Sequence, residues 1–148
     1  MARSSTPAPV RLVGPAAHPL YPALLPIPII CFAGALITDL AYIASMEMMW
    51  LDFSSWLLLA GLIGGGLAGA LLIIELVRSH NRRALVPHLA CLLAAWVIAV
   101  FNSFIHARDG WTAVVPTGLS LSIAATVLGV LAGWFWQSAY HRPAEIVR

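Results

Sequence analysis

Residues 56–77 read WLLLAGLIGGGLAGALLIIELV, an apolar run in which Glu75 is the one charged residue. Crossing the hydrocarbon core of a bilayer takes about 20 helical residues, so this run is long enough to span a membrane. Comparable runs cover about 21–44, 86–107 and 113–140. Irregular backbone is excluded from lipid, because its polar groups lack partners there. The sequence therefore predicts an all-α fold, a four-helix transmembrane bundle with up-down topology.

The composition agrees with a chain that lies almost entirely in lipid. Hydrophobic residues make up 61% of it and charged residues 9%, whereas a soluble domain has about 25% charged residues. Mean hydropathy is +0.90. We expect a flexible tail at 1–17, a transmembrane domain at 18–141 and a short tail at 142–148. The net charge of +2 lies in the flanks of the spans and indicates no nucleic-acid partner.

The basic residues predict the orientation of the bundle. All 8 are arginines, and all except Arg108 fall on one side of the predicted membrane. The residues of that side are Arg3, Arg11, Arg78, Arg82, Arg83, Arg142 and Arg148. Short loops rich in arginine stay in the cytoplasm, so both ends of the chain are predicted to be cytoplasmic.

The third apolar run has a face suited to helix packing. Small and polar side chains of the third run fall within about 40° of one line, at 100° per residue. They are His88, Leu92, Ala95, Ala99, Asn102 and His106, and the bulky Leu93, Val97, Val100, Phe101 and Phe104 lie opposite. Membrane helices turn small and polar residues toward neighbouring helices, which places the first set inside.

Glycines of the second and fourth runs predict close helix contacts. The residues concerned are Gly61, Gly65, Gly69, Gly129 and Gly133. They pack helices within one chain or between two copies, which leaves a homodimer open. The alternative is that the groove of the second run makes room for a flat cofactor.

Inward-facing ionisable residues are the candidates for chemistry, because charge is costly at membrane depth. On the predicted cytoplasmic side, His18 and His88 lie at the same level, with Glu75 beside them. Imidazole is a common ligand of haem iron and other metals. We therefore consider haem b, or an unidentified metal, held by His18 and His88.

The opposite end of the bundle also carries polar residues. Asp39, His106 and Asp109 are expected to form a polar cap or a proton entry point there, near Asn102 and Arg108. No second histidine on another span lies near His106 to complete a haem site. Few ionisable groups occupy the middle of the spans, which gives little support to a transporter. No Ser-His-Asp or Cys-His pattern is present, and we predict that the chain is not an enzyme.

Several motifs resemble a family of bacterial membrane proteins known as domain of unknown function 2231. They are residues 18–28 (HPLYPALLPIP), 38–42 (TDLAY), 101–111 (FNSFIHARDGW), 115–119 (VPTGL) and the closing Gly133-Trp134 with Tyr140. The similarity covers about 15–141. It implies four spans in a bacterial inner membrane and, through relatives joined to Rieske-type domains, a redox setting.

The chain also departs from that family's pattern. Tyr21 stands where many relatives have a second histidine, Glu75 replaces a frequent aspartate, and His141-Arg142 reverses the usual order. The resemblance carries over His18, Asp39, Glu75, His88, Asn102, His106, Arg108 and Asp109, without roles. The leading interpretation is a redox module that binds haem b and has a redox partner protein. The alternative is a structural or accessory membrane protein without cofactor.

Overall fold

The computed structural model describes residues 20–78, 82–108 and 114–140, and in this part of the chain every regular element is helical. The elements are α1 (Tyr21–Leu24), α2 (Pro26–Ser45), α3 (Met48–Arg78), α4 (Arg82–His106), the short π-helical turn η1 (Val114–Gly118) and α5 (Leu119–Tyr140). Four helices are long and apolar enough to cross a membrane: Tyr21–Ser45, Met48–Arg78, Leu85–His106 and Val114–Ala139. The predicted all-α, four-helix transmembrane bundle is confirmed. The predicted tails lie outside the described residues.

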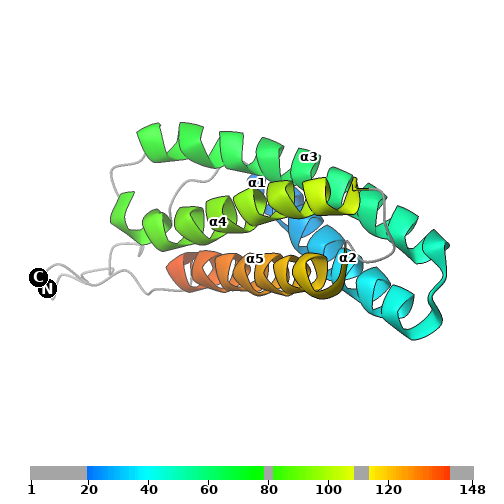
Figure 1. Cartoon of the computed structure of the whole chain (residues 1–148). Coiled ribbons are helices and arrows are strands. Elements are labelled where there is room, and N and C mark those ends of the chain that lie inside the picture. Colours follow the sequence, from blue (N-terminus) through cyan, green and yellow to red (C-terminus); the bar gives the residue numbers. More distant parts are fainter. Residues whose placement is uncertain (1–19, 79–81, 109–113, 141–148) are drawn as a thin grey trace, which may run out of the picture.

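The long helices form a ring in which each packs against its neighbours in sequence (Figure 1). α2 packs on α3, α3 on α4 and α4 on α5, and the contact of α5 with α2 closes the ring. The rings of Tyr21 in α1 and Trp136 near the end of α5 are 4.6 Å apart, so the first and last helices meet at one end of the bundle. This arrangement is the up-down topology expected for an even number of spans.

The first span is divided where its prolines lie. α1 ends at Leu24, and α2 begins with Pro26. Proline lacks a backbone N–H and cannot bond to the carbonyl one turn earlier, which weakens the opening turns of this span. Leu25 keeps helical dihedral angles and donates to the Tyr21 carbonyl at 3.0 Å, so α1 and α2 together form one span.

The turn between α2 and α3 is short. Met46 takes the left-handed conformation with φ of 56° and donates to the Tyr42 carbonyl at 2.7 Å, which ends α2. α3 starts at Met48, ahead of the predicted Trp56, and runs for 31 residues. The α2–α3 hairpin consequently reaches past the adjacent ends of α4 and α5 (Figure 1).

The apolar core has two layers along the bundle. One layer surrounds Tyr21 and Trp136, and the other surrounds Phe32 and Leu58. The second layer also contains Ala35, Ala95, Ala99 and Ala125, whose small side chains let the helices approach closely. Most of the remaining large apolar side chains are exposed, which suits a surface in contact with lipid.

The face predicted for α4 is confirmed. Leu92, Ala95 and Ala99 are buried, whereas Phe101 and Phe104 are 61% and 67% exposed. His88 and Asn102 are also buried. A period of 3.6 residues is enough to separate these two faces, because the inward positions carry the small and polar groups.

The glycines of α3 accommodate aromatic rings of the protein itself. A Cβ at Gly61 would lie 2.6 Å from the ring of Phe32, and one at Gly65 would lie 3.0 Å from the indole of Trp96. The Trp96 indole N–H also donates to the Leu62 carbonyl at 2.9 Å. This groove is therefore occupied by α2 and α4 side chains. A Cβ at Gly69 would meet nothing within 4 Å, so Gly69 makes no such close approach.

The glycines of α5 approach α2. A Cβ at Gly133 would lie 3.3 Å from Ile29, and one at Gly129 would lie 3.7 Å from the same side chain. Both glycines thus lie at a helix contact within one chain.

Candidate functional site

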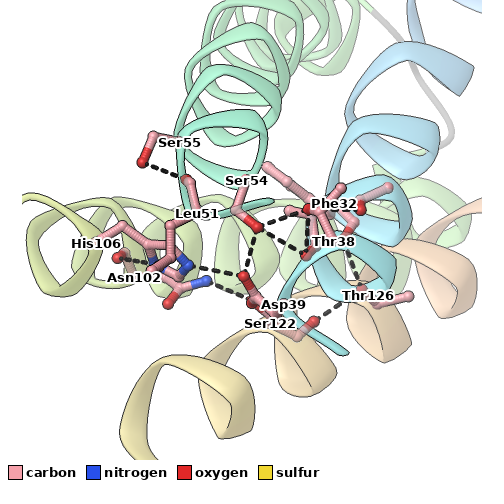
Figure 2. A network of polar contacts seen from close by, with 12 residues as sticks. Phe32, Thr38, Asp39, Leu51, Ser54, Ser55, Asn102, His106, Ser122 and Thr126 are labelled. Atoms are coloured by element: carbon pink, nitrogen blue, oxygen red, sulfur yellow. Dashed lines mark hydrogen bonds and ion pairs between the residues drawn. The ribbon is translucent and has the colours of Figure 1, made fainter. Parts of the chain in front are cut away.

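The Asp39 carboxylate joins all four long helices. Ser54 of α3 donates to its Oδ1 and Ser122 of α5 donates to its Oδ2, each at 2.5 Å. His106 Nε2 of α4 lies 2.9 Å from Oδ1. Figure 2 shows the three side chains converging on Asp39 from three directions. These four residues are called the Asp39 cluster below.

Further hydroxyl and amide groups extend the Asp39 cluster. Thr38 Oγ1 lies 2.6 Å from Ser54 Oγ, and Asn102 Nδ2 donates to Ser122 Oγ at 2.8 Å. Thr126 donates to the Phe32 carbonyl at 3.1 Å, which adds a bond between α5 and α2 (Figure 2). The oxygen Oδ1 of Asn102 is buried and has no hydrogen-bond partner among the described residues.

The Asp39 cluster is buried and contains an ionisable pair. The side chains of His106 and Asp39 are 1% and 0% exposed. The helix ends suit their charges: Ser122 lies in the first turn of α5, where the helix dipole favours an anion, and His106 ends α4, where it favours a cation. Hydroxyl donors, dipoles and an imidazole together offset the cost of burying the carboxylate.

A second polar cluster surrounds His88 near the opposite end of α4. Its Nδ1 lies 2.7 Å from the Ala132 carbonyl, and its Nε2 bonds with the Tyr21 hydroxyl. The ring of Trp136 lies 5.3 Å from the His88 ring. His88, Tyr21, Ala132 and Trp136 are called the His88 cluster below.

The two hydrogen bonds of the His88 ring determine its tautomer. A carbonyl oxygen only accepts, so Nδ1 must carry the proton that is donated to Ala132. In the neutral ring Nε2 is then the acceptor, and the Tyr21 hydroxyl donates to it. The lone pair that a metal would need is therefore engaged by Tyr21.

Two of the remaining predicted site residues, His18 and Asp109, lie outside the described residues. Glu75 is half-buried on α3 and is not among the hydrogen-bond partners of His88. Arg108 is exposed just beyond α4. Within 20–78, 82–108 and 114–140, no group of three or more His, Cys, Asp or Glu side chains is placed to hold a metal ion.

Several members of these clusters, among them Ser54, Tyr21 and Trp136, are not predicted as site residues from the sequence. Ser54 precedes the predicted second span. The helical period offers a signal for Ser54, because stepping back along the buried face of α3 from Gly61 leads to Leu58 and then to Ser54. No comparable signal pairs Tyr21 with His88, which lie 67 residues apart.

Comparison with known proteins agrees with this architecture. A family profile described as "Predicted membrane protein (DUF2231)" matches residues 17–142, which is most of the chain. No curated protein and no solved structure gives a significant match. The motifs around His18, Asp39 and His106 that resemble this family all lie within the matched range, and the chain belongs to the DUF2231 family of membrane proteins.

Proposed function

We propose that this chain is a non-enzymatic structural or accessory protein of the bacterial inner membrane, whose buried polar residues hold the helices in one arrangement. The Asp39 carboxylate carries this proposal, because it bonds to side chains from α3, α4 and α5 at once. In lipid the hydrophobic effect does not drive helices together, so such interhelical bonds and close packing contribute much of the specificity.

The competing redox role, with haem b between His18 and His88, receives less support from the geometry. Nε2 of His88 would be the iron ligand, since Nδ1 donates its proton to the Ala132 carbonyl. Nε2 is bonded to the Tyr21 hydroxyl, which would have to withdraw before iron bound. The His88 cluster therefore fits the role of an interhelical lock between α1, α4 and α5 better than that of a haem ligand.

A transport role is also less favoured. The layer of Phe32, Leu58 and alanine side chains separates the Asp39 cluster from the His88 cluster. His88 and Asn102 are 14 positions apart on α4, which is about 21 Å along a helix. A polar path for a solute or proton would need groups in this apolar layer.

The test combines a spectrum with a binding measurement on protein purified from native membranes in mild detergent. We expect an oxidised-minus-reduced visible spectrum without haem bands and a metal content below one per chain. An accessory protein should also co-purify with a membrane partner, either a second copy or another protein, in constant ratio. A Soret shift with α and β bands that disappears in His88→Ala would overturn the proposal in favour of the redox role.

A further inference from the structure

The hydrogen bonds of His106 specify how many protons the ring and its partner hold. Its Nδ1 lies 3.0 Å from the Asn102 carbonyl oxygen. Because a carbonyl oxygen has no proton to give, Nδ1 must be the donor. Nδ1 therefore donates its proton to the Asn102 carbonyl of α4 whether or not Nε2 is protonated.

The second bond of the ring then needs a proton of its own. His106 Nε2 and Asp39 Oδ1 are 2.9 Å apart, a distance at which one proton lies between two heavy atoms. That proton belongs either to an imidazolium facing a carboxylate or to a carboxylic acid facing a neutral ring. Both forms are neutral overall. Without the proton, the Nε2 lone pair would face a buried carboxylate, and the cluster would carry an uncompensated negative charge.

Few other groups can compensate for this charge. α3 contributes Ser54 and α5 contributes Ser122, and neither hydroxyl ionises near neutral pH. On α2, Tyr42 is a buried phenol one turn beyond Asp39. The charged groups described at this end, Glu47, Asp52 and Arg108, are exposed.

We infer that Asp39 and His106 form a binding site for a single proton, and that this proton holds the end of α4 against α2 and the start of α5. The element that lies next to the imidazole is η1. A Cβ at Gly118 in η1 would lie 3.3 Å from His106 Cε1, so η1 lies against the imidazole. η1 is also the point where the last span departs from regular helix, at Val115. Separation of the ring from the carboxylate should therefore displace η1 first.

The experiment measures the protonation of His106 by ¹⁵N NMR in detergent micelles, from about pH 5 to pH 10, a range that brackets ordinary histidine titration. The His106 signals are assigned by their loss in His106→Gln. We expect Nδ1 to stay protonated throughout, while the proton shared with Asp39 is released in a single step. Reversible unfolding in mixed micelles gives the second readout.

The direction of the stability change follows from counting protons. Once pH exceeds about 6.5, an imidazole in the unfolded chain is mostly neutral, whereas the folded site still holds its proton. The folded state then binds one proton more than the unfolded state, so stability falls as pH rises. One proton corresponds to about a tenfold fall in the folded-to-unfolded ratio per pH unit in this window.

Asp39→Asn provides the matched variant. Its amide can donate to a neutral His106 Nε2, and its remaining oxygen can accept from Ser122. Ser54 can donate to the Ala35 carbonyl, which already lies 3.2 Å from it. We expect this variant to fold, to keep Nε2 unprotonated and to lose the one-proton slope. Tyr21→Phe, which alters only the His88 cluster, should retain the slope.

Two outcomes would overturn the inference. One is a wild-type His106 whose Nε2–Asp39 bond holds no proton anywhere in the tested range. The other is a titration that is unchanged in Asp39→Asn. If Asp39→Asn does not fold, the wild-type NMR titration decides alone, because it reports Nδ1 and Nε2 separately.

Discussion

At the scale of single residues, hydrogen bonds between buried side chains connect all four long helices. Asp39 accepts from Ser54 and Ser122 and pairs with His106, while Tyr21 donates to His88. Apolar contacts in lipid discriminate poorly between helix orientations, because lipid tails are as apolar as leucine. Removing one of these buried side chains should therefore lower the free energy of unfolding more than removing a similar exposed side chain.

Asp39→Ala should lower the free energy of unfolding by about 3 to 5 kcal/mol, the usual cost of breaking a buried charged pair. Two serine hydroxyls and an imidazole lose their shared acceptor at the same time. Reversible unfolding in mixed micelles measures the change. Asp52→Ala, which removes an exposed aspartate of α3, is the control and should change stability by less than about 0.5 kcal/mol. Equal losses in both variants would contradict the role assigned to Asp39.

Tyr21→Phe should cost about 1 to 3 kcal/mol, because it leaves His88 Nε2 buried without a donor. A double-mutant cycle with His88→Leu separates this bond from the loss of packing. The second substitution should cost less in the Tyr21→Phe background than in the wild type. Strictly additive effects would show that the two side chains do not interact.

At the scale of helices, two glycines of α3 lie close to aromatic rings of α2 and α4. The ring of Phe32 lies over Gly61, and that of Trp96 lies over Gly65. Phe32 is 1% exposed, so it has little room to move away from an added methyl group. The packing of α2 against α3 should therefore depend strongly on Gly61.

Gly61→Ala should destabilise the bundle by about 1 to 3 kcal/mol, the typical cost of overpacking a filled core. Gly69→Ala is the matched control on the same helix, because its new methyl group meets nothing within 4 Å. That control should be neutral or slightly stabilising, since alanine favours helix over glycine by about 1 kcal/mol. Unfolding midpoints in mixed micelles compare the two. A larger loss in Gly69→Ala than in Gly61→Ala would contradict the observed packing.

These helices also show where sequence reasoning succeeds and where it stops. Hydropathy predicts the four spans, and the helical period places His88 and Asn102 inside, because both properties are local. The predicted second span begins at Trp56, because Asp52 interrupts the apolar run, whereas α3 begins at Met48. Ser54 lies in this additional part of the helix. The pairing of Asp39 with Ser122 joins residues 83 positions apart and depends on how α2 meets α5. No local pattern contains that information.

At the scale of the whole molecule, the arginines predict which end faces the cytoplasm. Arg78 and Arg83 lie at the connection of α3 with α4, while the turn between α2 and α3 lies at the other end. The positive-inside rule places the arginine-rich end in the cytoplasm. The Asp39 cluster would then lie toward the side of the membrane opposite the cytoplasm.

Cysteine labelling of intact cells tests this orientation. Met48→Cys and Arg83→Cys are made separately in a background in which the free cysteines Cys31 and Cys91 are replaced by alanine. Both chosen side chains are exposed. A membrane-impermeant maleimide should label Met48→Cys, and Arg83→Cys only after the cells are opened. The reverse pattern would mean that the bundle is inserted the other way round.

The length of α3 has a consequence for the membrane itself. Its 31 residues extend about 46 Å at 1.5 Å per residue, whereas the hydrocarbon core is about 30 Å thick. The helix must therefore tilt, carry its ends into the head-group layers, or thicken the bilayer around it. Because α3 packs along both α2 and α4, a change in its tilt is transmitted to the ring of helices. The thickness of the surrounding bilayer thus becomes a variable that acts on this fold.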